Sequence, residues 1–196
     1  MKDIDNKIDF FFENPNIWIE GRKRFSNLYL LRRDIIQCFG FDPSSGNKIG
    51  YRVLWPGAMS LLAGIDLLSK YYYGQDEFGK VGERFKGYIK KYININKDEA
   101  EIIYQLRNSL LHSFGLYSYK LDKITKKRIE FSFMLKATGD KFVSRITENK
   151  YLIDILTLWR EFEKSIPLYC CDLRNNDELK KNFYKMFPYY SITDIG

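Results

Sequence analysis

The sequence predicts a mainly α-helical fold, a helical bundle that carries a small antiparallel β-hairpin before its last helices. Apolar residues recur at three- and four-residue steps through most of the chain, as on the buried face of a helix. After Gly115 the period changes to two, in residues 117–121 and 129–135, as in paired strands. Hydrophobic residues make up 45% of the 196 residues, which is enough for a folded core.

The first third of the chain is predicted to be an arm followed by two helices. Residues 1–20 are expected to form an irregular arm that packs on the body. Helical spacing covers residues 25–39, and a turn-rich break follows at 42–47. The next helix covers residues 55–73, with Pro56 in its first turn. It is apolar on several faces, which is typical of a central bundle helix or of an interface.

Two further helices are expected before the strands. The first is short and covers residues 81–93. The second begins after Asn96, because Asn96 with Glu99 three residues later forms a capping-box pattern. Gly115 is expected to end this helix in the left-handed conformation, where glycine has no steric penalty.

The last elements are a hairpin with a basic tip, a third strand and two helices. The third strand is expected at residues 142–146, and helical spacing returns over residues 151–166 until Pro167 ends it. Residues 175–187 form a final amphipathic helix. No repeat and no long linker divides the chain, so we expect a single domain over residues 1–196. Its parts are a core of about 25–165, the N-terminal arm at 1–20 and a C-terminal helical extension at 167–196.

Composition narrows the classes of function. Lys plus Arg outnumber Asp plus Glu by 32 to 25, which gives a net charge of +7. This excess favours a polyanionic partner such as RNA, DNA or a nucleotide, although lysine also serves solubility. Three cysteines without a CxxC pair and one histidine do not make a structural zinc site, so neither a metal nor a cofactor is expected.

No segment of the sequence is expected to enter a membrane. The N-terminus is charged and lacks an apolar signal core, and the longest apolar stretch, residues 53–65, is too short to span a bilayer. We therefore expect a cytoplasmic protein with no membrane partner.

The only histidine, His112, is the first candidate for acid–base chemistry, because an imidazole with its ordinary pKa of about 6.5 titrates near neutral pH. Asn108 lies four residues earlier and shares its helix face, while Ser109 and Ser113 form a second pair. Arg107 lies five residues earlier, about 140° around the helix. It can reach the same anion as His112 by folding its side chain around the helix, or by acting from a partner subunit. In the alternative interpretation, His112 simply interacts with the last carbonyl groups of its helix.

Asp66 is the one acid in the apolar helix over residues 55–73. It is either a solvated or capping carboxylate or a polar residue that faces the active cleft. The sequence contains no G-x-x-x-x-G-K-[ST], H-E-x-x-H or G-x-S-x-G motif, and its carboxylates do not form the set of a two-metal nuclease.

The segment Arg107-Asn108-x-x-x-His112 resembles the signature of the HEPN domain family. In that family an arginine, commonly followed by a polar residue, precedes a histidine by four to six residues late in a long bundle helix. The aromatic and basic helix over residues 84–92 and the hairpin after the motif also resemble it. The resemblance covers about residues 25–165 and implies a HEPN-like bundle of about four to six helices.

The resemblance implies a metal-independent endoribonuclease, typically a homodimer whose two motif helices face each other across a cleft. Cleavage then proceeds by attack of the RNA 2′-hydroxyl and leaves a 2′,3′-cyclic phosphate. His112 suits the proton transfer, Arg107 suits stabilisation of the charged phosphorane, and Asn108 could orient the imidazole or donate to a phosphate oxygen. With one histidine per chain, a separate base and acid require the His112 of both protomers.

The alternative function is a non-catalytic HEPN-like module that binds RNA or a nucleotide, or a dimeric scaffold. In either case the RNA, single-stranded or structured, would follow exposed cations. A toxin or defence role is associated with the family as a whole. Asp66, Ser109 and Ser113 are the predicted supporting residues of the site. The predicted nucleic-acid-binding residues are Arg84, Lys90, Lys91, Lys126, Lys127 and Arg128.

Overall fold

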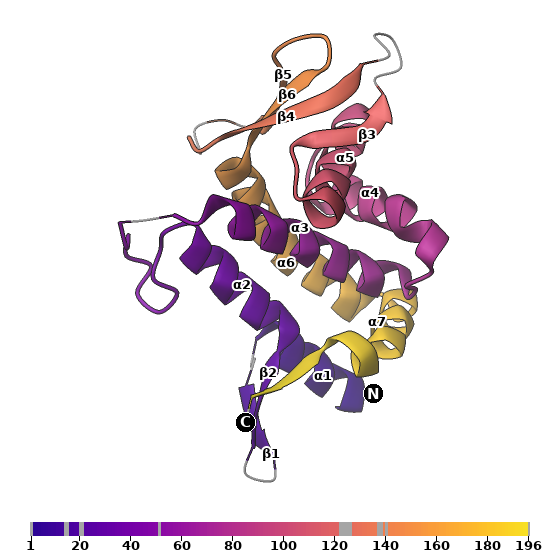
Figure 1. Ribbon diagram of the computed structural model, residues 1–196. Helices are drawn as coiled ribbons and strands as arrows, with labels where there is room; N and C mark the ends of the chain where they lie inside the picture. The colour runs from indigo at the N-terminus through magenta and orange to yellow at the C-terminus, as the bar shows by residue number, and fades with distance from the viewer. Residues whose placement is uncertain are drawn as a thin grey trace. The chain divides into compact units, whose positions relative to one another are not determined.

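The computed structural model describes residues 2–13, 16–19, 22–50, 52–121, 127–136, 139 and 141–195. The described residues form seven α-helices, one short 3-10 helix and two small sheets, which confirms the mainly α class (Figure 1). The sequence predicted four to six helices. The chain divides into two compact units, a first unit of Met1–Tyr88 with Ile166–Gly196 and a second unit of Ile89–Ser165.

The helices of the first unit pack around α3 (Leu54–Tyr73), as its apolar character predicted. Helix α2 (Asn27–Cys38) lies along α3, and α7 (Asp177–Tyr190) also packs on it (Figure 1). Pro56 lies in the first turn of α3, and Gly74 ends the helix at φ 62°, ψ 28°. Proline in the first turn and a left-handed glycine after the last turn are common signals of helix ends. The predicted helices over 25–39 and 55–73 are confirmed as α2 and α3.

The predicted irregular arm is wrong, because Lys2–Phe12 form a helix and Asn16–Ile19 form a strand. Helix α1 (Lys2–Phe12) buries Ile8 and Phe11, which are spaced by three residues on one helical face. Strand β1 (Asn16–Ile19) pairs with β2 (Arg22–Ser26), and β2 pairs with β7 (Ile192–Ile195), all antiparallel. The helical spacing was present in the sequence, but the Phe10–Phe12 run obscured it.

The helix predicted over residues 151–166 is also wrong at both ends. Strand β6 (Lys150–Asp154) occupies its start, and α6 (Ile155–Asn175) continues well past Pro167. A proline inside a helix removes one backbone hydrogen bond. The buried residues Ile166 and Tyr169 flank Pro167, and their burial favours the continued helix over the local preference of proline.

The predicted last helix is confirmed as α7, whose start is displaced by two residues because Asn176 caps it. The Asn176 side chain accepts hydrogen bonds from the backbone N–H groups of Glu178 and Leu179.

The second unit contains α5 (Lys97–Ser113) and a sheet of strand order β3-β4-β6-β5. The hairpin of β3 (Tyr117–Leu121) and β4 (Arg128–Met134) is confirmed, although residues 122–126 of its tip lie outside the described part. Strand β5 (Val143–Arg145) confirms the third predicted strand. It pairs with β6, and β6 runs parallel to β4, a pairing that the sequence did not predict. The remaining predicted helix is confirmed as α4 (Val81–Tyr92), which begins in the first unit and ends in the second.

An ion-pair network around the buried Arg84 joins several elements of the first unit. Arg84 of α4 is 1% exposed, and its Nη2 lies 2.8 Å from Asp76 Oδ1 and 3.4 Å from Asp66 Oδ1 of α3. Asp76 Oδ2 accepts hydrogen bonds from Lys70 of α3, at 2.9 Å, and from the hydroxyl of Tyr190 of α7. Burial raises the pKa of Asp76, but the bonds from Tyr190 and Lys70 and the charges of Lys70 and Arg84 outweigh it, so the pKa lies below its usual value.

Replacement of Arg84 tests whether this network stabilises the fold. We expect Arg84→Met to lower the free energy of unfolding by about 3–5 kcal/mol, because it removes the buried cation that pairs with Asp66 and Asp76. Arg33→Ala is the matched control, because the Arg33–Asp34 pair is exposed and should contribute about 0–1 kcal/mol. Urea denaturation measures both. Equal losses in the two variants would show that the network does not carry stability.

No helix among the described residues is both long and apolar enough to cross a membrane.

Candidate functional site

The motif residues lie on the last two turns of α5, whose start is fixed by the predicted capping box. Asn96 Oδ1 accepts from the backbone N–H groups of Asp98 and Glu99, both at 2.9 Å, and Glu99 Oε2 accepts from the Asn96 N–H at 3.1 Å. A buried apolar stripe then holds the helix in the second unit. Its fully buried members are Ala100, Ile103, Leu106 and Leu110.

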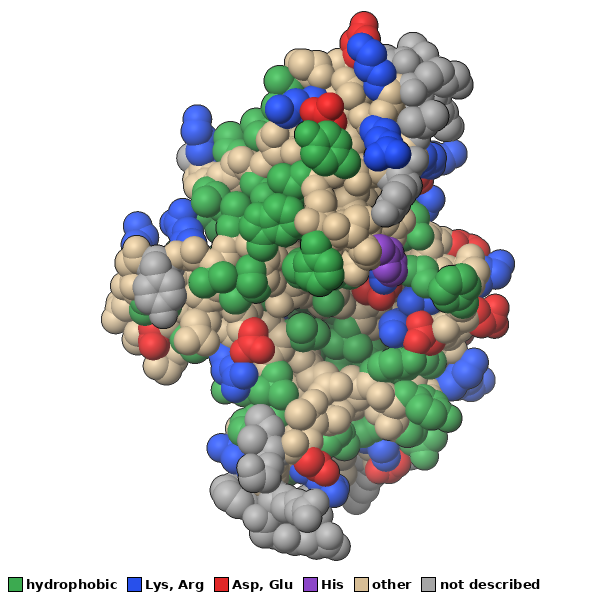
Figure 2. Space-filling view, in the orientation of Figure 1, with side chains coloured by type: hydrophobic (Ala, Val, Ile, Leu, Met, Phe, Trp, Pro, Cys, Tyr) green, Lys and Arg blue, Asp and Glu red, His purple; other side chains and the backbone are tan. Residues whose placement is uncertain are grey.

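Arg107 folds around α5 and contacts His112 of the same chain. Its Nη1 lies 2.9 Å from His112 Nε2 and 3.2 Å from Asn108 Oδ1. This is the first of the two arrangements that the helical spacing left open, because the long side chain covers the angle between the two positions. Arg107 is 9% exposed, whereas His112 is exposed. Figure 2 shows the imidazole, in purple, at the surface of the molecule.

The arginine contact sets the proton position on the imidazole. A guanidinium has N–H donors and no acceptor, so His112 Nε2 must accept from Arg107 Nη1 and carries no proton. The neutral ring then carries its hydrogen on Nδ1. Because Nη1 has two hydrogens, one bonds to His112 while the other bonds to Asn108.

Asn108 acts on the arginine rather than on the imidazole. The sequence placed Asn108 over His112, with a role in orienting the ring or in donating to phosphate. In the structure its Oδ1 accepts from Arg107 Nη1, and the half-buried amide thereby helps to hold the guanidinium against His112. Asn108 is therefore a positioning residue for Arg107.

The predicted supporting residues divide between different environments. Ser109 is 1% exposed and its hydroxyl donates to the carbonyl of Gln105 at 2.9 Å, so its polar group is satisfied within the helix. The Ser113 hydroxyl is buried, and the described atoms offer it no hydrogen-bond partner. Asp66 belongs to the first unit, where it pairs with Arg84, and this contact gives it a structural role.

Among the predicted nucleic-acid-binding residues, the prediction for Arg84 is wrong. Its guanidinium is buried between two carboxylates, so it cannot contact a phosphate backbone. Four others are exposed cations of the second unit, the unit that holds the motif, and Lys126 lies outside the described residues. The four are Lys90, Lys91, Lys127 and Arg128.

The corner between α5 and β3 differs from the sequence prediction. Phe114, rather than Gly115, adopts the left-handed conformation, with φ 47° and ψ 38°, and its N–H donates to the carbonyl of Ser109. Gly115 N–H donates to the same carbonyl at 3.2 Å. Gln105 Oε1 accepts from the Ser118 hydroxyl at 2.8 Å, a bond that ties β3 to α5. The helix ends one residue early because these bonds to Ser109 and Gln105 fix the turn.

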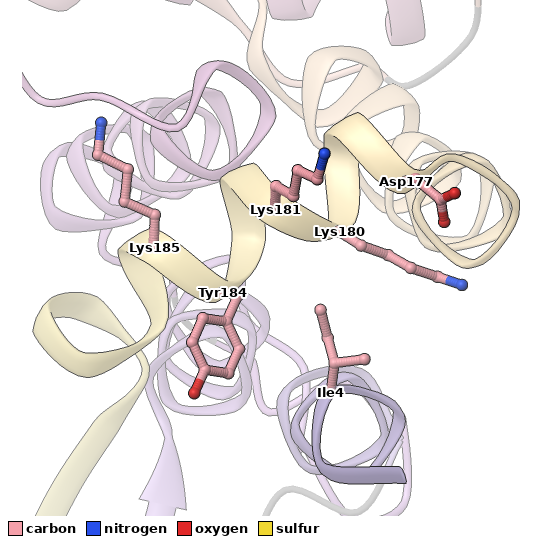
Figure 3. Close-up of a pocket in the computed structure, with 6 residues that line it drawn as sticks. All are labelled: Ile4, Asp177, Lys180, Lys181, Tyr184 and Lys185. Carbon is pink, nitrogen blue, oxygen red and sulfur yellow. The ribbon is translucent and has the colours of Figure 1, made fainter. Parts of the chain in front are cut away.

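A separate open pocket of about 400 Å³ lies in the first unit, and the sequence did not predict it. Ile4 of α1 forms one side, and Asp177 and lysines of α7 form the other (Figure 3). Its full lining is Ile4, Asp177, Lys180, Lys181, Tyr184 and Lys185. Three lysines give this pocket positive charge, but it lacks an imidazole, so the motif on α5 remains the stronger candidate site.

Comparisons with known proteins leave the site to be interpreted from its own geometry. No family model, no curated protein and no solved structure matches this chain. Among the described residues, no group of three or more His, Cys, Asp or Glu side chains could hold a metal ion. The site is therefore defined as an arginine–asparagine–histidine cluster at the C-terminal end of a capped helix.

Nuclear magnetic resonance can test this geometry directly, because the chain has a single histidine. At a pH high enough to leave the imidazole neutral, we expect long-range ¹H–¹⁵N spectra to show the hydrogen on Nδ1 and none on Nε2. Arg107→Ala removes the donor to Nε2 and should shift the tautomer toward Nε2–H. An Nε2–H tautomer in the wild-type protein would contradict the Arg107–His112 contact.

Proposed function

We propose that this chain is a HEPN-like, metal-independent endoribonuclease that acts as a homodimer. The observation that supports it most is the 2.9 Å contact between Arg107 Nη1 and His112 Nε2, with the imidazole exposed. A proton-accepting nitrogen next to a permanent cation is the pair of groups that metal-free cleavage of a phosphodiester requires.

The proposed reaction begins when an RNA phosphate binds the Arg107 guanidinium. Phosphate oxygens are stronger acceptors than a neutral imidazole, so Arg107 turns from His112 toward the phosphate. The lone pair of His112 Nε2 then takes the proton of the 2′-hydroxyl while the 2′-oxygen attacks phosphorus. Arg107 stabilises the negative charge of the phosphorane, and Asn108 keeps the guanidinium in place.

The second half of the reaction needs an acid. When the bond from phosphorus to the 5′-oxygen breaks, that oxygen must receive a proton, and a 2′,3′-cyclic phosphate remains on the other fragment. His112 of the same chain has just accepted a proton and serves as the base. We therefore propose that a protonated His112 of a second copy supplies the acid, with two motif helices facing each other. Lys90, Lys91, Lys127 and Arg128 are exposed and would follow the RNA backbone.

The second candidate function is a non-catalytic module that binds RNA or a nucleotide, or a dimeric scaffold. It is favoured by the depth of Arg107, which is 9% exposed and already bonded to its neighbours. If Arg107 stays on His112 when RNA binds, the site positions a ligand without cleaving it. Of the two candidate functions we propose the ribonuclease. We infer that it acts in the cytoplasm, either in RNA processing or in a toxin or defence system.

Cleavage of single-stranded RNA in EDTA tests the reaction. We expect the wild-type protein to produce 2′,3′-cyclic phosphate ends, and His112→Ala to reduce the rate by at least about 10²-fold, the usual contribution of a general base. Arg107→Ala should cause a comparable loss, and Asn108→Ala a smaller one because it acts through Arg107. Circular dichroism and melting curves control for folding. Full activity of His112→Ala would rule out the mechanism, and binding without any cleavage would favour the module.

Mixed dimers test whether two protomers share one site. Wild-type chain is refolded or co-expressed with a nine-fold excess of His112→Ala, and cleavage is measured per wild-type chain. If the base and the acid come from different protomers, activity should fall to about one tenth, because most wild-type chains then pair with an inactive partner. Unchanged activity per wild-type chain would show that each protomer works alone.

A further inference from the structure

Phe114 lies at the corner that follows the motif helix, in a left-handed backbone conformation that residues other than glycine rarely adopt. Among the described residues it is the one non-glycine residue with positive φ, at 47°, and its side chain is 72% exposed. An L-amino acid in this region has its Cβ too close to a neighbouring carbonyl oxygen, and glycine is the usual occupant. The exposed ring does not recover that cost through burial in its own chain.

The corner holds the Phe114 ring close to the proposed active site. Phe114 is two residues from His112, so their Cα atoms are at most about 7 Å apart. Its N–H and that of Gly115 both donate to the carbonyl of Ser109, and Ser118 is tied to Gln105. The backbone on both sides of Phe114 is therefore hydrogen-bonded to α5. A second aromatic side chain, Tyr117, is 58% exposed at the start of β3.

We propose that Phe114 is a stacking platform for a nucleobase of single-stranded RNA, next to the phosphate that Arg107 and His112 engage. This proposal rests on the proposed function and adds a substrate-binding residue to it. An exposed aromatic ring beside phosphate-binding cations is the combination that binds single strands, because every base has a face that can stack. The hydrogen-bonded corner fixes the backbone from which the Phe114 ring projects, and the exposed Tyr117 offers a second aromatic ring for a neighbouring base.

The first test compares Phe114→Leu with Phe114→Tyr on a short single-stranded RNA. Leucine keeps the apolar bulk and removes the aromatic face, so the Kd and KM should rise by about 5- to 100-fold, whereas tyrosine should remain near wild type. Phe78→Leu is the matched control, since Phe78 is a 98% exposed phenylalanine of the first unit. Binding is measured by fluorescence anisotropy on the His112→Ala background, where the RNA stays intact, and KM by cleavage with the wild-type histidine.

An RNA with an abasic ribonucleotide at each position in turn identifies the stacked base. At the stacked position, removal of the base should weaken binding to the wild type, yet cause little further loss in Phe114→Leu. Additive losses at every position would show that the ring contacts no base.

Phe114→Gly separates stacking from a purely structural role. Glycine relieves the positive φ, so the melting temperature should rise, while RNA affinity should fall as in Phe114→Leu. A Phe114→Gly or Phe114→Leu protein that binds and cleaves RNA like wild type would overturn the stacking role and leave the ribonuclease intact. Binding that depends on Phe114 without any cleavage would support stacking and overturn the ribonuclease. A wild-type protein that neither binds nor cleaves RNA, including one that binds only a protein through this corner, would overturn both.

Discussion

The burial of one positive charge constrains the arrangement of the first unit. Arg84 is 1% exposed, and a guanidinium cannot lose its proton, so it must keep carboxylates beside it. Asp66 and Asp76 meet this requirement, and Asp76 in turn binds Lys70 and Tyr190. The network thereby fixes α3, the segment before α4, and the end of α7 relative to one another. A change that moves Asp66 or Asp76 away from Arg84 would remove a counter-charge from the buried guanidinium.

The two arginines that the sequence singled out have different partners and therefore different roles. Arg84 binds carboxylates and is a structural cation. The contacts of Arg107 include an amide oxygen and an imidazole nitrogen, and in the proposed function an incoming phosphate would replace the imidazole. The position of Arg84 in an aromatic and basic helix therefore led to a wrong prediction of phosphate binding. The fold brings Asp66 and Asp76 to Arg84 and brings His112 and Asn108 to Arg107, and spacing along one helix does not contain this information.

Local signals in the sequence predicted the elements that local chemistry controls. The capping box at Asn96 and Glu99, Pro56 in the first turn of α3, and the two-residue period of the hairpin all correspond to observed structure. The errors occur where distant segments decide the outcome. The parallel pairing of β4 with β6 places residues 151–154, predicted to be helical, in a strand, and burial around Pro167 keeps α6 continuous. At the site, the helical angle gave two possible paths for Arg107, and only side-chain geometry distinguishes them.

In the proposed reaction, the Arg107–His112 contact would also hold the site at rest until RNA binds. While Arg107 Nη1 donates to His112 Nε2, the lone pair that must accept the 2′-hydroxyl proton is occupied. In the proposed reaction, a phosphate that draws the guanidinium away would free this lone pair and place the cation on the group that becomes charged, so that binding and activation would occur in one movement. Asn108 limits that movement because it holds the same Nη1 atom. A nucleobase stacked on Phe114 would keep the phosphate in place during this exchange, and the strained corner after His112 would then serve the same step as the motif.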